Sequence, residues 1–113
     1  MEEKPKFKIV YSEEAISFLK SLGDKAKAKI MYNINRSKYV IDKTFFKKLE
    51  GSEIWEFRTL YDGIQYRLFS FWDTDEDTLV VATHGIIKKT QKTPSKEIAK
   101  AERIRKEYFS SKK

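Results

Sequence analysis

The sequence predicts an α+β domain with a small antiparallel sheet, because strand-like and helix-like segments follow one another along one short chain. Residues 54–72 consist of two β-rich runs around Asp62-Gly63, which is a strong hairpin signal. Two helix-like segments precede this hairpin, and a third helix-like segment ends the chain. With 113 residues, the chain is expected to form a single domain, residues 1–113.

The predicted hairpin places two arginines opposite each other. If Asp62-Gly63 forms a two-residue turn, counting outward pairs Arg58 with Arg67 across the strands. Opposed like charges destabilise a sheet, so such a pair either contacts carboxylates or holds an anion. We adopt the anion hypothesis and expect Arg67 on an exposed sheet face. The alternative is that the arginines are solvated or neutralised by Glu56 on the same strand face.

The residues before the hairpin predict one strand and two helices. Phe7–Tyr11 has a strand pattern, and Ser12 is expected to cap a helix that ends at Gly23. We expect Asp24 to cap a second helix that runs to about Lys38, with its lysines on a solvated face. Residues 39–51 show no clear period.

Two cations precede the hairpin, and an acidic run follows it. Lys47 or Lys48 could reach the arginine face. Residues 73–77 have aspartates at alternate positions, as in a calcium loop, but lack that loop's later glycine and glutamate. We therefore predict a solvated loop without metal. The apolar run Leu79–Thr83 is expected in the interior of the sheet.

The last part of the chain holds its one histidine. His84 follows the predicted last strand, and residues at strand ends are held rigidly while remaining open to ligand. Thr93 as cap and Pro94 at the first helical position predict a final helix. Its apolar stripe is expected to include Ile98, Ala101, Ile104 or Arg105, and Tyr108, with fraying from Ser110 onward.

The composition limits the classes of function. Lys and Arg number 24 against 17 Asp and Glu, and the net charge of +7 suits a polyanion such as nucleic acid. The absence of cysteine excludes disulfides, thiolate zinc sites and a cysteine nucleophile. No apolar run approaches the ~20 residues of a membrane helix, and the N-terminus lacks signal-peptide features. We expect a cytoplasmic protein without membrane contact.

The candidate catalytic residues are basic and gather near one end of the predicted sheet: Arg58, Arg67, His84, Lys88 and Lys89. Such a set suits charge stabilisation at a phosphate and acid–base transfer, as in RNA cleavage by a neighbouring 2′-hydroxyl, and needs neither metal nor cofactor. Trp55, Tyr61 and Tyr66 are candidates for stacking on bases. The alternatives are a hydrogen-bonded structural His84 and aromatic residues that belong to the core.

Two segments carry a resemblance to a known family. Residues 49–58, which contain Trp55-Glu56-Phe57-Arg58, and residues 84–94, with their His-x-x-x-Lys-Lys-Thr-Gln-Lys-Thr-Pro run, resemble the phage-derived Gp49-like, HigB-type toxins of the RelE/ParE superfamily. The similarity extends from about Phe7 to Arg105.

The resemblance implies two N-terminal helices packed on an antiparallel sheet, a C-terminal helix and a ribosome-dependent mRNA endoribonuclease. The expected partners are mRNA, the ribosome and a cognate helix-turn-helix antitoxin. By position, the catalytic roles fall on Arg58, Arg67, His84, Lys88 and Lys89. RNA-binding roles are predicted for Lys47, Lys48, Gln91 and Lys92. Thr83 and Gly85 flank His84 where relatives often carry another aromatic residue or histidine, so the general base stays open.

Two other functions fit the same residues. A ParE-like member of the fold would inhibit gyrase and would not need the basic catalytic set. A non-catalytic RNA-binding module would use that set for affinity alone. Mapping mRNA ends after expression in cells would separate the three.

Overall fold

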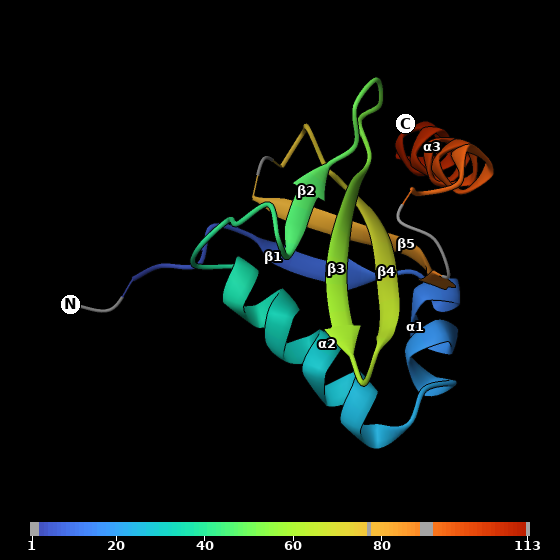
Figure 1. The fold of residues 1–113 in the computed structure, drawn as a ribbon. Coiled ribbons are helices and arrows are strands. Elements are labelled where there is room, and N and C mark those ends of the chain that lie inside the picture. Colours follow the sequence, from blue (N-terminus) through green and yellow to red (C-terminus); the bar gives the residue numbers. More distant parts are fainter. Residues whose placement is uncertain (1–2, 77, 89–91, 113) are drawn as a thin grey trace.

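The computed structural model describes residues 3–76, 78–88 and 92–112, which form a five-stranded sheet with helices on both faces (Figure 1). In chain order the elements are β1 (Lys8–Tyr11), α1 (Glu13–Lys20), α2 (Asp24–Ser37), β2 (Phe46–Lys48), β3 (Trp55–Tyr61), β4 (Ile64–Trp72), β5 (Leu79–Lys88) and α3 (Ser95–Ser111). The α+β fold class is confirmed. β2, which has only three residues, was not predicted from the sequence.

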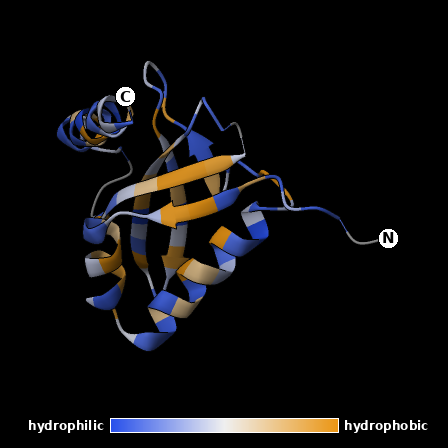
Figure 2. Cartoon of the chain, turned by 180° about the vertical axis from the view of Figure 1, so that it is seen from behind, coloured by the Kyte–Doolittle hydropathy of each residue, from blue (hydrophilic) through white to orange (hydrophobic). Residues whose placement is uncertain are grey.

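The sheet is mixed, whereas the sequence analysis predicted an antiparallel sheet. Its strand order is β1-β5-β4-β3-β2, and β1 pairs in parallel with β5 while the other neighbours are antiparallel. The chain leaves β1 through two helices and three strands before β5, and so long a crossover allows a parallel pair. β5 lies between β1 and β4, which confirms the interior position predicted for its apolar run; Figure 2 shows hydrophobic residues along both β1 and β5.

The central hairpin has the predicted register. Asp62 and Gly63 both have positive φ angles, 51° and 75°, as a type I′ turn requires. Arg58 accordingly pairs with Arg67. The Asp-Gly signal therefore fixed the cross-strand neighbours correctly.

Helices α1 and α2 cover one face of the sheet, as expected (Figure 1). Ser12 caps α1 by accepting a hydrogen bond from the backbone N–H of Ala15 at 3.0 Å. The N-cap of α2 is Gly23 and not Asp24, which was predicted to cap it. Asp24 instead lies in the first turn, where its carboxylate suits the helix dipole. The core beneath these helices is rich in aromatic residues from β2, β3 and the start of the chain.

Gly85 lets α1 approach the sheet closely. A Cβ atom added at position 85 would overlap the ring of Phe18 on α1. We therefore expect Gly85→Ala to lower the free energy of unfolding by about 1–3 kcal/mol, as overpacking does. Urea unfolding measures this loss. In a Phe18→Ala background the same substitution should cost much less, and an equal cost in both backgrounds would contradict this explanation.

Helix α3 covers the other face, where its Ala101 is fully buried against a second core cluster that includes Phe69 and Phe71. The helix continues to Ser111, so fraying from Ser110 is wrong. Its end is fastened by Asp73, whose carboxylate accepts bonds of 2.6 Å from both Tyr108 and Lys112.

Asp73 was predicted to lie in a solvated loop, and this is wrong because its side chain is fully buried. Besides the two side chains of α3, the backbone N–H groups of Asp75 and Glu76 donate to it at 2.8 and 3.1 Å. Burial alone would raise the pKa of Asp73, but the bonds from Lys112 and Tyr108 outweigh burial and hold the pKa well below 3.8. The charged carboxylate is thus a structural link between the β4–β5 loop and α3.

The effect of Asp73→Asn should depend on pH. Because the folded pKa of Asp73 is depressed, its charge contributes stability above the unfolded pKa near 4 and loses that contribution as the pH falls below it. At pH 7 we expect the asparagine variant to melt about 5–10 °C lower than the wild type. The gap in melting temperature should narrow steadily below pH 4. A gap that is constant from pH 7 to pH 3 would show that the charge of Asp73 is not what matters.

Within the described ranges, none of the helices combines the length and apolar character needed to cross a membrane.

Candidate functional site

Four cations gather on the sheet face that α3 partly covers, and we call them the basic cluster: Lys47, Arg58, Arg67 and Lys88. The strand register brings them together. Lys47 of β2 pairs with Glu56 of β3, Arg58 pairs with Arg67, and Lys88 of β5 pairs with Gln65 of β4. Cross-strand partners share a face, and residues two apart on one strand also do.

Glu56 lies between the two arginines. Its Oε2 is 3.5 Å from Arg58 Nε, and its Oε1 is 3.6 Å from Arg67 Nε. Thr93 donates a hydrogen bond of 2.9 Å to Glu56 Oε1, and Lys88 Nζ lies 3.5 Å from the same hydroxyl. Neutralisation by Glu56, the alternative to the anion hypothesis, is therefore present in the structure. Among the described residues, Glu56 is the carboxylate that lies between these four cations, and the cluster keeps excess positive charge.

Arg67 is buried, with 3% of its surface exposed, so its predicted exposure is wrong. It lies on β4, the middle strand, where Arg58 and Ile86 flank it from the neighbouring strands. Its terminal nitrogens donate to the Gln65 side chain at 2.7 Å and to the Tyr66 carbonyl at 3.1 Å. Within the described part of the chain, its Nε has no hydrogen-bond acceptor.

Burial and crowding shift two of these cations toward their neutral forms. Burial lowers the pKa of Arg67, Glu56 opposes this shift, and Arg58 adds to it. The pKa of Lys88 is likewise lowered by burial and by Arg67, with Glu56 again opposing. Lysine has the lower ordinary pKa, 10.5, so its shift brings it closer to proton transfer near neutrality.

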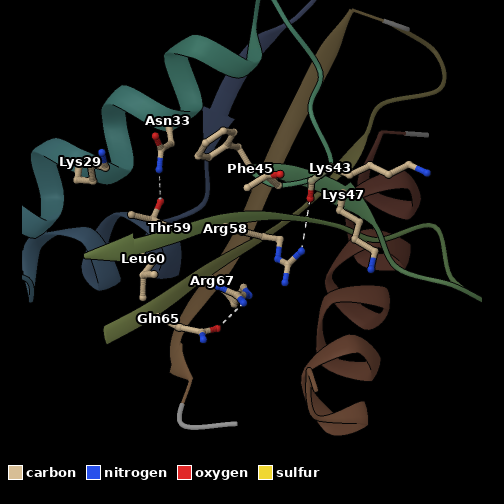
Figure 3. Close-up of a pocket in the computed structure, with 11 residues that line it drawn as sticks. Lys29, Asn33, Lys43, Phe45, Lys47, Arg58, Thr59, Leu60, Gln65 and Arg67 are labelled. Carbon is tan, nitrogen blue, oxygen red and sulfur yellow. Dashed lines mark hydrogen bonds between the residues drawn. The ribbon is translucent and has the colours of Figure 1, made fainter. Parts of the chain in front are cut away.

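A pocket of about 610 Å³ opens beside the basic cluster (Figure 3). Lys47, Arg58 and Arg67 line one part of it, and Lys29 of α2 lines another. The complete lining is Lys29, Asn33, Lys43, Thr44, Phe45, Lys47, Arg58, Thr59, Leu60, Gln65 and Arg67. Among the residues that the structure describes, this lining includes five cations and no carboxylate. The pocket suits an anion.

His84 is buried under α3, with 2% of its surface exposed. It does not end its strand as predicted, because β5 continues to Lys88. Its Nε2 lies 3.0 Å from Glu97 Oε1 on α3, and its Nδ1 lies 3.1 Å from the Thr83 hydroxyl. Burial lowers the pKa of His84, although the hydrogen bond with Glu97 opposes this shift, and the net shift favours the neutral ring. The hydrogen-bonded alternative describes this residue well.

The remaining predicted residues do not lie together in the basic cluster. Tyr66 belongs to the core under α1 and α2, and Trp55 and Tyr61 are partly buried against that core, on the face opposite the arginines. This placement favours the core alternative over base stacking. Lys48 pairs with Trp55, so its side chain lies on the opposite face of the sheet from that of Lys47. Lys92 is exposed just before α3. Lys89 and Gln91 lie outside the described residues.

Several residues of the site were missed by sequence reasoning. Thr93 was interpreted as a helix cap, but its hydroxyl bonds Glu56 and the N-cap of α3 is Pro94. Lys29 was assigned to a solvated helix face, and Lys43 was not singled out. No local pattern distinguishes these two lysines from their neighbours, because only the fold brings α2 and residues 43–47 beside the hairpin.

The comparisons with known proteins agree with this fold. The sequence profile of the phage-derived Gp49-like protein family matches residues 17–106. A mutant of the E. coli toxin RelE in the free state superimposes with a TM-score of 0.60 at 17% identity, covering 86% of this chain and 93% of that one. No curated protein sequence matches the chain.

Two toxin–antitoxin complexes also contain chains of this fold. The intact E. coli RelBE complex gives a TM-score of 0.55 at 18% identity, with 76% of this chain and 99% of that one covered. The RelBE2 complex of Mycobacterium tuberculosis gives 0.56 at 20% identity, with 74% and 99% covered. At such identities the likeness defines the fold.

Proposed function

The chain belongs to the family of phage-derived Gp49-like proteins, and on this premise we propose that it is the toxin of a type II toxin–antitoxin pair that cleaves mRNA on the ribosome. The observation that carries the proposal is the basic cluster, with its buried arginine beside a pocket that five cations line. The RelE-like fold supports it, since two of the similar structures are toxin–antitoxin complexes. The HigB subtype and a helix-turn-helix antitoxin follow from the sequence resemblance.

The chemistry assigned to the cluster is attack of an RNA 2′-oxygen on its neighbouring phosphorus. The P–O2′ bond forms, the P–O5′ bond breaks, and a 2′,3′-cyclic phosphate and a 5′-hydroxyl result. Arg58 and Arg67 stabilise the extra negative charge on the phosphate oxygens, a task for which the planar guanidinium is suited. Lys88, with its lowered pKa, accepts the proton of the 2′-hydroxyl, and the leaving 5′-oxygen takes up a proton from water to become the 5′-hydroxyl.

Other residues serve this reaction indirectly. Lys47 faces the same site, and we propose that it binds the RNA backbone. The predicted roles of Lys48, Lys89, Gln91 and Lys92 in RNA binding or catalysis stay predictions. For His84 we propose a positioning role, because Nε2 is engaged with Glu97 and the ring is buried. It holds α3, whose preceding Thr93 contacts Glu56.

Substitutions at Lys88 and His84 should separate these roles. Lys88→Met should lower the cleavage rate at least about 100-fold, as loss of a general base does, with little change in ribosome binding. His84→Gln should keep most of the single-turnover rate, because an amide can still bond Glu97. Cleavage of ribosome-bound mRNA by the purified variants, followed from pH 6 to pH 9, measures the cleavage rates of both. The wild-type rate should rise with pH as Lys88 loses its proton.

If His84→Gln abolishes cleavage while Lys88→Met retains it, the proton acceptor is the histidine. A Lys88→Met enzyme that keeps the rising pH profile would equally exclude Lys88. Melting temperatures of both variants establish that the fold is intact before the rates are compared.

Induced expression in cells tests the function itself. The proposed toxin should arrest growth and produce new mRNA ends that carry a 5′-hydroxyl. Inhibition of DNA supercoiling by gyrase without new mRNA ends would instead favour the ParE-like alternative. RNA binding that slows translation without any cut would favour the non-catalytic module.

A further inference from the structure

The pocket beside the basic cluster extends well beyond the two arginines. Lys43, Thr44 and Phe45 precede β2, and Lys29 and Asn33 come from α2. Figure 3 shows Arg58 and Arg67 on the hairpin, with Lys43 and Lys47 on one side and Lys29 and Asn33 of α2 on the other. The cations therefore surround a hollow between the hairpin, α2 and the segment before β2.

The hollow follows an edge of β3. β2 pairs only with residues Trp55–Phe57, and the last strand contact on that side is the bond from the Arg58 N–H to the Phe45 carbonyl at 2.8 Å. In the described part of the chain, no strand pairs with Thr59–Tyr61 on this side. A ligand can thus lie against this edge without displacing an element of the sheet.

The pocket is lined by apolar and uncharged polar side chains as well as by cations. Leu60 is 64% exposed, and the ring of Phe45 has the guanidinium of Arg36 4.5 Å from its centroid. The floor holds the buried Asn33, whose amide donates to Thr59 Oγ1 at 3.1 Å. At about 610 Å³ the hollow falls in the size range of small-ligand sites. Buried Arg67, with an Nε that has no acceptor among the described residues, also lines it.

We propose that this pocket is a nucleotide subsite, in which Lys29 and Lys43 bind the phosphate of the nucleotide next to the scissile bond and the edge of β3 receives its sugar and base. The proposal rests on the proposed function, because the arginine end of the pocket is the assigned site of cleavage. It extends the substrate contact from the sheet face to α2. Phosphate recognised there can belong to an RNA strand or to a free nucleotide.

The test removes two pocket cations that are not part of the basic cluster. In Lys29→Ala/Lys43→Ala, both replaced side chains are exposed, so the fold should be retained. The matched control is Lys20→Ala/Lys27→Ala, which removes the same charge from exposed positions of α1 and α2 outside the pocket. Equal melting temperatures for the three proteins establish a fair comparison.

The first probe is a fluorescent 2′-O-methyl hexanucleotide, which binds without being cleaved. We expect the pocket variant to bind it at least about 10-fold more weakly at low salt, and the control about 2-fold at most. The slope of log affinity against log salt should fall by about 0.7 in the pocket variant, the value for one lost phosphate contact on a single strand. An equal loss in both double variants would overturn the subsite in favour of diffuse attraction.

The second probe is adenosine 3′-monophosphate, observed through the amide signals of the protein by NMR. Its addition should shift the signals of Thr59 and Leu60 in the wild type and in the control, but not in the pocket variant. If RNA is bound and cleaved normally by the pocket variant, the subsite is wrong and the proposed function stands. If the nucleotide shifts these signals but no RNA is ever cleaved, the subsite stands and the proposed function fails.

Discussion

Replacing Arg58 by alanine is expected to abolish growth arrest and to lower the cleavage rate about 100- to 1000-fold, the usual cost of one lost donor to transition-state charge. The fold should survive this change. The Arg58 side chain is 28% exposed, and its ion pair with Glu56 has a long separation of 3.5 Å. We therefore expect the free energy of unfolding to fall by no more than about 1 kcal/mol.

Arg67→Ala should lose activity to a similar degree but should also destabilise the protein. Its guanidinium is buried and bonded to Gln65 and to the Tyr66 carbonyl, and its removal leaves these groups without a partner. The expected cost is about 1–3 kcal/mol. Urea unfolding and single-turnover cleavage of ribosome-bound mRNA, measured on the same preparations, separate the two effects.

The contrast between the two variants is what identifies the arginine pair as functional. Arg58→Ala separates activity from folding, because activity should disappear from a protein whose free energy of unfolding falls by no more than about 1 kcal/mol. Cleavage that survives in Arg58→Ala would show that the cross-strand pair is a structural feature, neutralised by Glu56 and unconnected with RNA. Arg58→Lys serves as a control, since it keeps the charge but not the planar fork.

Local signals predicted the parts of the fold that local physics determines. Asp62-Gly63 specified the turn, the turn specified the register, and the register placed Arg58 opposite Arg67. The cap at Ser12 was equally local. Each of these features depends on residues a few positions apart, so periodicity and turn chemistry were sufficient.

Burial of charge could not be predicted, because it depends on elements that are distant in the sequence. Asp73 is covered by α3, whose Tyr108 and Lys112 are 35 and 39 residues away. Glu56 meets Thr93 across 37 residues. The sequence analysis interpreted the aspartates of residues 73–77 as a solvated loop and Thr93, which precedes a proline, as a helix cap. Both are the common local explanations of such patterns. Only the packing of α3 on the sheet reveals the partners.

In the candidate site too, local signals predicted some residues, and contacts between distant segments determine the others. The residues that share the hairpin were placed together correctly, whereas Lys29 and Lys43 became part of the site only through the packing of α2 and of the segment before β2. His84 shows the opposite case. Its position after an apolar run favoured a loop, but the strand continues past it and α3 covers it.

Glu56→Gln is expected to have opposite effects on stability and on anion binding. Glu56 is buried, with 3% of its surface exposed, and its carboxylate lies beside Arg58 and Arg67. Loss of its charge leaves the buried Arg67 without the carboxylate that offsets its burial. Breaking a buried ion pair costs about 3–5 kcal/mol, and because the contacts are long, at 3.5 and 3.6 Å, we expect a loss of about 3 kcal/mol.

The same substitution should strengthen the binding of phosphate to the cluster, because the carboxylate competes with any anion for the two arginines. Glutamine can still accept the hydrogen bond of Thr93, so the position of α3 should change little. Addition of inorganic phosphate should therefore raise the melting temperature of Glu56→Gln more than that of the wild type, since at a given concentration the ligand that binds more tightly stabilises the folded state more. Thr93→Val is the matched control, because it removes the hydrogen bond to Glu56 but leaves the charge. If phosphate stabilises Glu56→Gln no more than the wild type, Glu56 does not compete for the arginines, and the anion is bound elsewhere.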